Sequence, residues 1–140
     1  MITLNYLAVI GAAVASMIVG FVWYGPLFGK LWMKLSGITT ADMESGKKKG
    51  MAKTYLLAFV GSLVMSYVLA NFLVFASAYF NEVSVKGGLI TGFWSWLGFV
   101  APVTLGSVLW EGKSWKLWFL NNAYYLVTLS VMGLILAAWQ

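Results

Sequence analysis

The chain has 140 residues, of which 61% are hydrophobic and only 9% are charged. Soluble domains carry about 25% charged residues, so this composition excludes a soluble globular protein and predicts an integral membrane protein. The formal net charge is +5, but with so few charges the excess of lysine indicates a surface that faces lipid headgroups, and it argues against nucleic acid as a partner.

Two residue types that carry much of protein chemistry are missing. The sequence contains no Cys and no His, which excludes disulfides, thiolate nucleophiles and the commonest ligands of zinc and haem. It also lacks a phosphate-binding glycine loop and a nucleophile elbow. We therefore expect no catalytic residue, no metal and no cofactor, and we interpret the protein as non-enzymatic.

Four long apolar runs fit into this length. A helix that crosses a bilayer needs roughly 20 residues, and the runs cover about residues 4–24, 52–80, 87–110 and 116–139. The sequence therefore predicts an all-α fold in which one transmembrane domain, residues 1–140, forms a four-helix bundle.

The first run ends in aromatic residues followed by Gly25 and Pro26. Because proline cannot continue the hydrogen-bond pattern of a helix and disfavours a helical residue before it, we expect the span to end here. Apolar residues then recur at helical spacing in residues 27–35, which predicts a short interfacial helix between spans one and two. The lysines that follow either bind anionic lipid or only orient the chain: Lys47, Lys48 and Lys49.

Small residues recur at every fourth position in the first two spans, and such a stripe lets two membrane helices approach closely. We predict that the two stripes pack on each other. Asn71 follows the second stripe, and its amide needs a partner in hydrocarbon; we expect a hydrogen bond to another helix, with a solute contact as the alternative. The stripes consist of Ala8, Ala12, Ser16 and Gly20 in span one, and of Ala58, Ser62, Ser66 and Ala70 in span two.

Pro102 interrupts the third run and frees the carbonyl of residue 98, so we expect a kinked helix. Spans broken by glycine and proline mark the transport site of some membrane proteins. Packed bundles also tolerate such kinks without any role in transport.

One carboxylate, Glu111, lies where the third run meets the membrane surface. If span four folds back at residue 112, Glu111 comes within reach of Asn121 or Asn122. The group then forms a proton or cation site, or Glu111 pairs with Lys113 or Lys116 and only fixes the turn. The interiors of the spans hold no charged residue, which argues against a proton-coupled pump.

Tryptophan and tyrosine favour the two membrane interfaces. We expect interface anchors at Trp23, Tyr24, Trp32, Trp110, Trp115, Trp118 and Trp139, and we regard the deeper Trp94, Trp96, Tyr124 and Tyr125 as candidates for lining a pocket. Eight of the nine lysines fall in the two loops on one side, and only Lys86 falls on the other. The positive-inside rule then predicts that the lysine-rich loops face the cytoplasm and both termini lie outside.

Residues 20–32 align without gaps with residues 106–118 and share Gly, Val, Lys, Leu and Trp at matching positions. This indicates either a parallel repeat of two hairpins or two membrane exits that use the same residue types.

Two parts of the chain resemble the signatures of a known family. The first is residues 20–33, and the second combines residues 110–113 with the downstream segments 121–124 and 132–139. Both are similar to the domain-of-unknown-function 1761 family of small bacterial membrane proteins. The resemblance implies a four-span membrane protein and brings no established activity.

Taken together, these patterns favour a protein of a bacterial cytoplasmic membrane that acts through helix packing, as a homo-oligomer or as an accessory subunit of a membrane complex. The alternative is a pathway for a small solute or ion, formed between protomers close to Glu111, Asn121, Asn122 and the kink at Pro102.

Overall fold

The computed structural model describes residues 4–81 and 84–139, and this part of the chain is helical with short turns and contains no β-strand. Four stretches are long and apolar enough to cross a membrane: Tyr6–Leu27, Ala52–Phe80, Val85–Leu109 and Trp115–Ala138. The chain is therefore a multi-pass membrane protein with an all-α fold. The elements are α1 (Tyr6–Val22), η1 (Trp23–Leu27), α2 (Gly29–Ser36), α3 (Thr40–Lys48), α4 (Ala52–Phe80), α5 (Val85–Phe99), α6 (Ala101–Thr104), α7 (Gly106–Leu109) and α8 (Trp115–Ala138).

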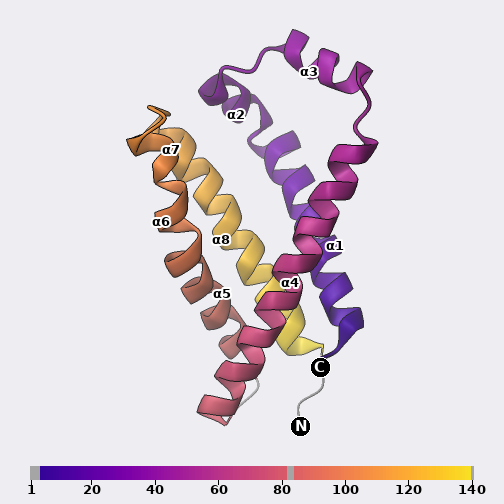
Figure 1. Ribbon diagram of the computed structural model, residues 1–140, viewed down its shortest axis with the longest axis vertical. Helices are drawn as coiled ribbons and strands as arrows, with labels where there is room; N and C mark the ends of the chain where they lie inside the picture. Colours follow the sequence, from indigo (N-terminus) through magenta and orange to yellow (C-terminus); the bar gives the residue numbers. More distant parts are fainter. Residues whose placement is uncertain (1–3, 82–83, 140) are drawn as a thin grey trace.

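The two ends of the bundle differ in charge. At one end lie α2, α3 and the turn between α7 and α8, and at the other end lie the chain termini and the connection between α4 and α5 (Figure 1). Eight lysines belong to the first end, and Lys86 belongs to the second. The short connection predicted at residues 81–86 includes Glu82 and Val83, which lie outside the described residues.

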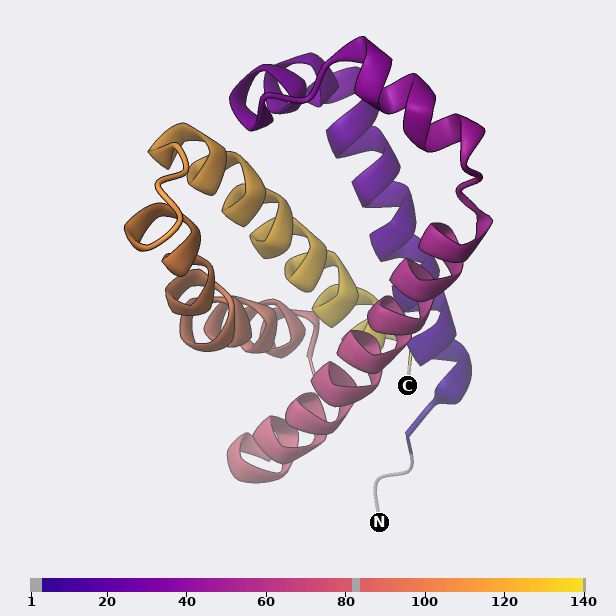
Figure 2. The ribbon, with the colours of Figure 1, turned by 45° about the horizontal axis from the view of Figure 1, so that its top comes forward.

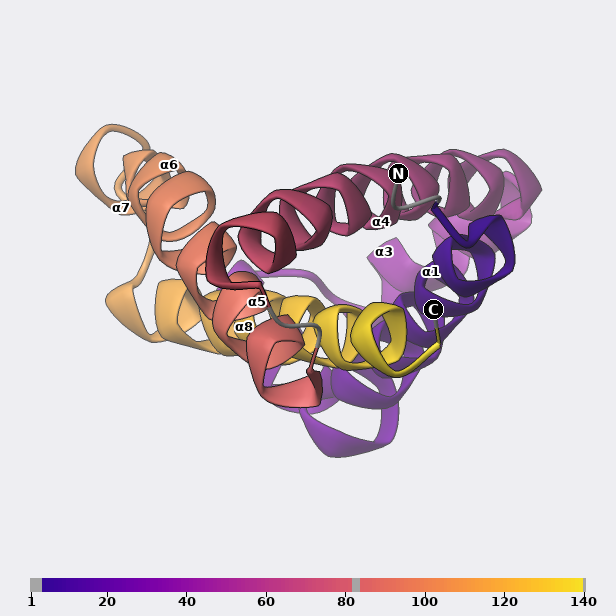
Figure 3. The same ribbon diagram turned by 90° about the horizontal axis from the view of Figure 1, so that it is seen from below.

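Helix α8 is the centre of the packing. It lies between α5 and α1, and α4 runs along one side of this group (Figures 2 and 3). All three of α1, α4 and α8 contribute to one buried apolar cluster, which consists of Ala8, Val9, Ala12, Leu69, Ala70, Leu73, Leu129, Met132, Leu136 and Ala137. This cluster fills the middle of the bundle and the end that carries the termini.

The closest contact between helices joins α5 to α8. A Cβ atom added to Gly92 would lie 2.6 Å from the carbonyl oxygen of Leu129, and a Cβ at Gly88 would collide with the backbone of Gly133. Only glycine permits this approach, because the two backbones touch directly. The sequence interpretation assigned packing stripes to the first two spans and did not predict this pairing.

The stripes of α1 and α4 meet over part of their length, since the two helices cross (Figure 1). Ser66 is fully buried and its hydroxyl donates to the carbonyl of Val9 at 2.8 Å, and Ser62 lies against the sulfur of Met17 at 3.8 Å. Ala58 is exposed, so α1 does not cover this position of the α4 stripe. Gly20 faces α8 instead of α4, because the nearest atom to a Cβ there is the Tyr124 hydroxyl at 3.1 Å.

Pro26 does not end the first helix, contrary to the prediction. The chain continues through Trp23–Leu27 as a turn of π-helix, in which the amide of Phe28 donates to the carbonyl of Trp23 at 2.8 Å. The wider turn accommodates the proline ring without a clash with the preceding turn.

The connection between the first two spans contains two short helices, where one was predicted. Helix α2 ends at Ser36, because the following Gly37 has a φ of 72°, and α3 begins at Thr40. The start of α3 is a capping box: the Thr39 hydroxyl accepts from the amide of Asp42, and the Asp42 carboxylate accepts from the amide of Thr39.

Candidate functional site

The third span is broken close to Pro102, as the sequence predicted. Helix α5 ends at Phe99, Val100 leaves the helical pattern with φ −116°, and Pro102 lies in the first turn of α6. The hydroxyl of Thr104 donates to the carbonyl of Val100 at 2.8 Å. The amide of Thr104 donates to the same carbonyl at 3.0 Å, so two bonds from one residue hold the turn that follows the break.

Thr104 is also the centre of a partly buried hydrogen-bond network with α8. Its single proton belongs to the short bond to Val100, so its oxygen accepts from the Asn122 amide at 3.0 Å and from the Trp118 indole at 3.1 Å. Asn122 is 2% exposed; its amide also donates to the Trp118 carbonyl, and its oxygen accepts from the Trp96 indole at 3.2 Å. The hydrogen-bonding capacity of Asn122 is therefore used within the protein.

A cavity of about 290 Å³ lies beside this network, between α6, α7 and α8. It brings together three of the residues that the sequence singled out, Glu111, Asn121 and Asn122. The full lining is Val103, Thr104, Gly106, Ser107, Glu111, Trp118, Asn121, Asn122 and Tyr125. Thr104 and Ser107 were missed, because a hydroxyl residue inside an apolar run gives no signal of its own.

Asn121 connects the cavity to the first span. The hydroxyl of Tyr24, in the π-helical turn, donates to the Asn121 oxygen at 2.7 Å. The Tyr24 ring is fixed by edge contacts with Trp32 and Tyr124, whose centroids lie 5.7 and 5.0 Å away. The π-turn therefore bonds span one to a residue that lines the cavity between spans three and four.

Glu111 and Lys113 form an exposed pair at the mouth of the cavity. The nitrogen–oxygen distance is 3.9 Å, and the side chains are 63% and 57% exposed, so the pair contributes at most about 1 kcal/mol. The turn is held by its backbone: the amide of Glu111 donates to Gly106, the amide of Lys113 donates to Ser107, and Gly112 has a φ of 68°. The carboxylate is therefore not needed to fix the turn.

Other candidates lie elsewhere. The Asn71 amide donates to the carbonyl of Tyr67 at 2.9 Å, one turn back in its own helix, so the predicted bond to another helix is wrong. An i−4 carbonyl satisfies the amide locally and removes the need for a distant partner. Tyr24 and Trp118, predicted as interface anchors, have their polar atoms bonded inside the bundle, whereas Trp110 is 88% exposed and Trp139 is 48% exposed.

Within residues 4–81 and 84–139, no group of three or more acidic, His or Cys side chains could hold a metal ion.

A family described as "Protein of unknown function (DUF1761)" matches residues 7–137. The chain belongs to this family. The DUF1761 match extends from α1 to α8 and includes the π-turn, the broken span and every residue of the cavity. No curated protein and no solved structure matches the chain.

Proposed function

We propose that this membrane protein binds a small polar solute with a positive or hydrogen-bonding group, without catalysis, in the cavity between α6, α7 and α8. The observation that carries the proposal is that Glu111 and Asn121 line the same cavity, beside a broken span. Membrane proteins place broken helices where backbone and side-chain polar groups line a solute site.

The groups that remain free define the solute. Asn122 is saturated, but the Asn121 nitrogen and the Tyr125 hydroxyl make no hydrogen bond with any described residue, and both residues line the cavity. The lining includes no lysine and one carboxylate, that of Glu111, which forms only a weak, exposed pair with Lys113 at the mouth of the cavity. A cavity of about 290 Å³ with this lining suits a small amine, amide or polyol better than an anion.

Beyond the cavity, towards the end that carries the termini, α8 is packed against apolar side chains. Further along α8, the buried side chains are apolar except for Thr128: Leu129, Met132 and Leu136 belong to the central cluster. Passage of a solute across the membrane would therefore need a rearrangement of the broken span or a path between protomers. A binding site accessible from the lysine-rich end is the simpler function.

The absence of cysteine from the sequence permits a direct test. Ser107→Cys places a thiol in the cavity wall, and its modification by a cationic and an anionic methanethiosulfonate reagent is followed in vesicles. The attraction between one carboxylate and a cationic reagent close to water is worth roughly 1 kcal/mol. We therefore expect the cationic reagent to react faster than the anionic one, and Glu111→Gln to reduce this ratio of rates about fivefold. Ser45→Cys, exposed on α3, gives the rates outside the cavity. Identical rates with and without the Glu111 change would refute a cation-selective cavity.

A second candidate function is helix packing in a homo-oligomer or as an accessory subunit. It is supported by α4, where Ala58 is exposed and a Cβ at Gly61 would meet no atom within 4 Å. Small residues with open space beside them allow another helix to approach. Oxidative cross-linking of Ala58→Cys in membranes tests this, with Leu56→Cys on the opposite face of α4 as the control. A homo-oligomer predicts a cross-linked dimer for the first variant alone, and an accessory subunit predicts a cross-link to another protein.

The lysine distribution supports a place in a bacterial cytoplasmic membrane with the lysine-rich end inside and both termini outside. Lys47, Lys48 and Lys49 follow one another at the end of α3, where they would contact anionic lipid. Labelling of single cysteines at residues 45 and 86 in intact cells with an impermeant reagent tests the orientation, since only the second should react.

A further inference from the structure

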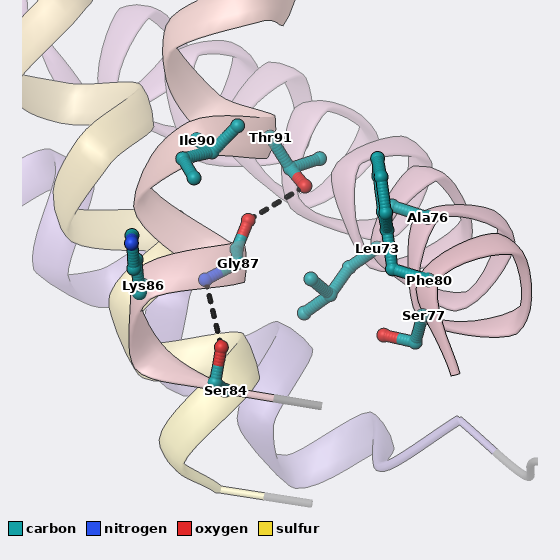
Figure 4. Close-up of a pocket in the computed structure, with 9 residues that line it drawn as sticks. All are labelled: Leu73, Ala76, Ser77, Phe80, Ser84, Lys86, Gly87, Ile90 and Thr91. Atoms are coloured by element: carbon teal, nitrogen blue, oxygen red, sulfur yellow. Dashed lines mark hydrogen bonds between the residues drawn. The ribbon is translucent and has the colours of Figure 1, made fainter. Parts of the chain in front are cut away.

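A second cavity, of about 310 Å³, lies at the opposite end of the bundle, between the end of α4 and the start of α5 (Figure 4). The α4 side, called here the apolar wall, carries Leu73, Ala76 and Phe80, with Ser77 among them. The α5 side, called here the polar wall, carries Ser84, Lys86, Gly87 and Thr91, with Ile90 among them. The two sides of the cavity thus suit the apolar part and the polar part of an amphiphilic ligand.

Ser77 is the unusual residue of this cavity. It is 6% exposed, and its hydroxyl makes no hydrogen bond with any described residue. Serine and threonine inside a helix usually donate to a carbonyl one turn back, as Thr91 and Ser95 do here at 2.8 Å. Figure 4 shows that the Ser77 oxygen is directed from α4 towards the wall that carries Ser84 and Gly87. A buried hydroxyl without a partner is costly, so its direction into a cavity indicates a missing ligand atom.

The polar wall is suited to an anion. It is formed by the N-terminus of α5, a helix of 15 residues, where backbone N–H groups and the helix dipole favour negative charge. The Ser84 hydroxyl accepts from the amide of Gly87 at 3.0 Å and fixes this turn. Lys86 adds a positive charge, and it is the single lysine at this end of the bundle.

We infer that this cavity binds the phosphate headgroup of a membrane phospholipid, with the start of an acyl chain on the apolar wall. The headgroup accepts hydrogen bonds from Ser77 and from Lys86. Phe80, which lines the cavity, and its neighbour Tyr79 are 71% and 84% exposed at the end of α4, and aromatic side chains of this kind favour the membrane interface. The site is independent of the solute cavity at the lysine-rich end.

The test uses the full chain in a neutral detergent, with thermal stability measured against added ligand. The probes are short-chain phosphatidylglycerol, diacylglycerol of the same chain length and inorganic phosphate. We expect stabilisation by the phospholipid at low concentration, and a loss of about tenfold in its apparent affinity for Lys86→Gln. Lys53→Gln removes the same charge at the other end of α4 and should leave the affinity unchanged.

Ser77→Ala gives a result that a purely structural serine would not give. Without lipid, this variant should be at least as stable as the natural chain, because a buried hydroxyl without a partner is removed. With phospholipid, it should gain less stability than the natural chain. Unchanged affinity in both Ser77→Ala and Lys86→Gln would overturn the site. Equal affinity for diacylglycerol would overturn the role of the phosphate, and equal affinity for inorganic phosphate would overturn the role of the lipid chain.

Discussion

Thr104 is the residue whose loss should disturb the broken span most. Thr104→Val keeps the shape of the side chain and removes the oxygen that accepts from Asn122 at 3.0 Å and from Trp118 at 3.1 Å. Two donors then lose their acceptor, and one of them belongs to a residue that is 2% exposed. Hydrogen bonds between membrane helices are worth about 0.6 kcal/mol on average and about 1.7 kcal/mol at most. We therefore expect Thr104→Val to lower the free energy of unfolding by roughly 1–3 kcal/mol.

The matched control is Thr128→Val, the same substitution in α8. Thr128 is 3% exposed, and its hydroxyl makes no hydrogen bond with any described residue. Removal of this hydroxyl should leave the protein equally stable or up to about 1 kcal/mol more stable. The measurement is unfolding of the detergent-solubilised chain, followed by circular dichroism. If Thr104→Val is no less stable than Thr128→Val, the network does not hold the broken span in place.

Three further changes test other parts of the structure. Gly133→Ala should destabilise the chain by about 1–3 kcal/mol through overpacking against α5, whereas Gly61→Ala, which meets no atom, should be neutral or stabilising in the same unfolding measurement. Hydrogen bonds from the backbone and then the side chain of Thr39 lower the pKa of Asp42 below its usual value, so the start of α3 should be intact above that usual value and should unfold as the pH falls through the lowered pKa. The NMR signal of the Thr39 amide follows this change, and Asp42→Asn should remove the pH dependence. Tyr24→Phe removes the bond from the π-turn to the cavity and should speed modification of Ser107→Cys, with an unchanged rate counting against a link between the two.

The large-scale fold follows from the sequence because hydrophobic length and lysine position are properties of single segments. The four apolar runs and the break near Pro102 could be predicted in this way. The main helix contact could not, since it depends on Gly88 and Gly133, which lie far apart in the chain and must face each other. Gly88 and Gly92 have the four-residue spacing of a packing stripe, and so do Gly133 and Ala137 in α8, but the first two spans carry such stripes as well, so the spacing does not identify the partner.

The site was predicted in outline for a similar reason. Glu111, Asn121 and Asn122 are polar residues near a turn, and a hairpin brings such residues together. The Thr104 oxygen accepts from Trp118 and Asn122, both in α8. It can do so because Thr104 follows the break at Val100 and faces α8. The proposed repeat also depends on local structure: residues 23–27 form a π-helix, whereas the matching residues 109–113 include the turn after α7. The two segments therefore use shared residue types in different conformations.

The two halves of the third span are held to α8 by different forces, and this difference locates the part that can move. In α5 the contact is made by backbone against backbone at Gly88 and Gly92, where a shift of either helix would create a collision or a void. In α6 and α7 the contact depends mainly on hydrogen bonds around Thr104, which can exchange with a solute or with water. A solute that enters the cavity therefore meets α8, which is packed rigidly against α5, on one side and a small, separately hinged segment on the other. If the protein changes shape on binding, residues 101–109 should move while α5 stays in place, and single-cysteine distance measurements from α8 to each half can distinguish this from a movement of the whole span.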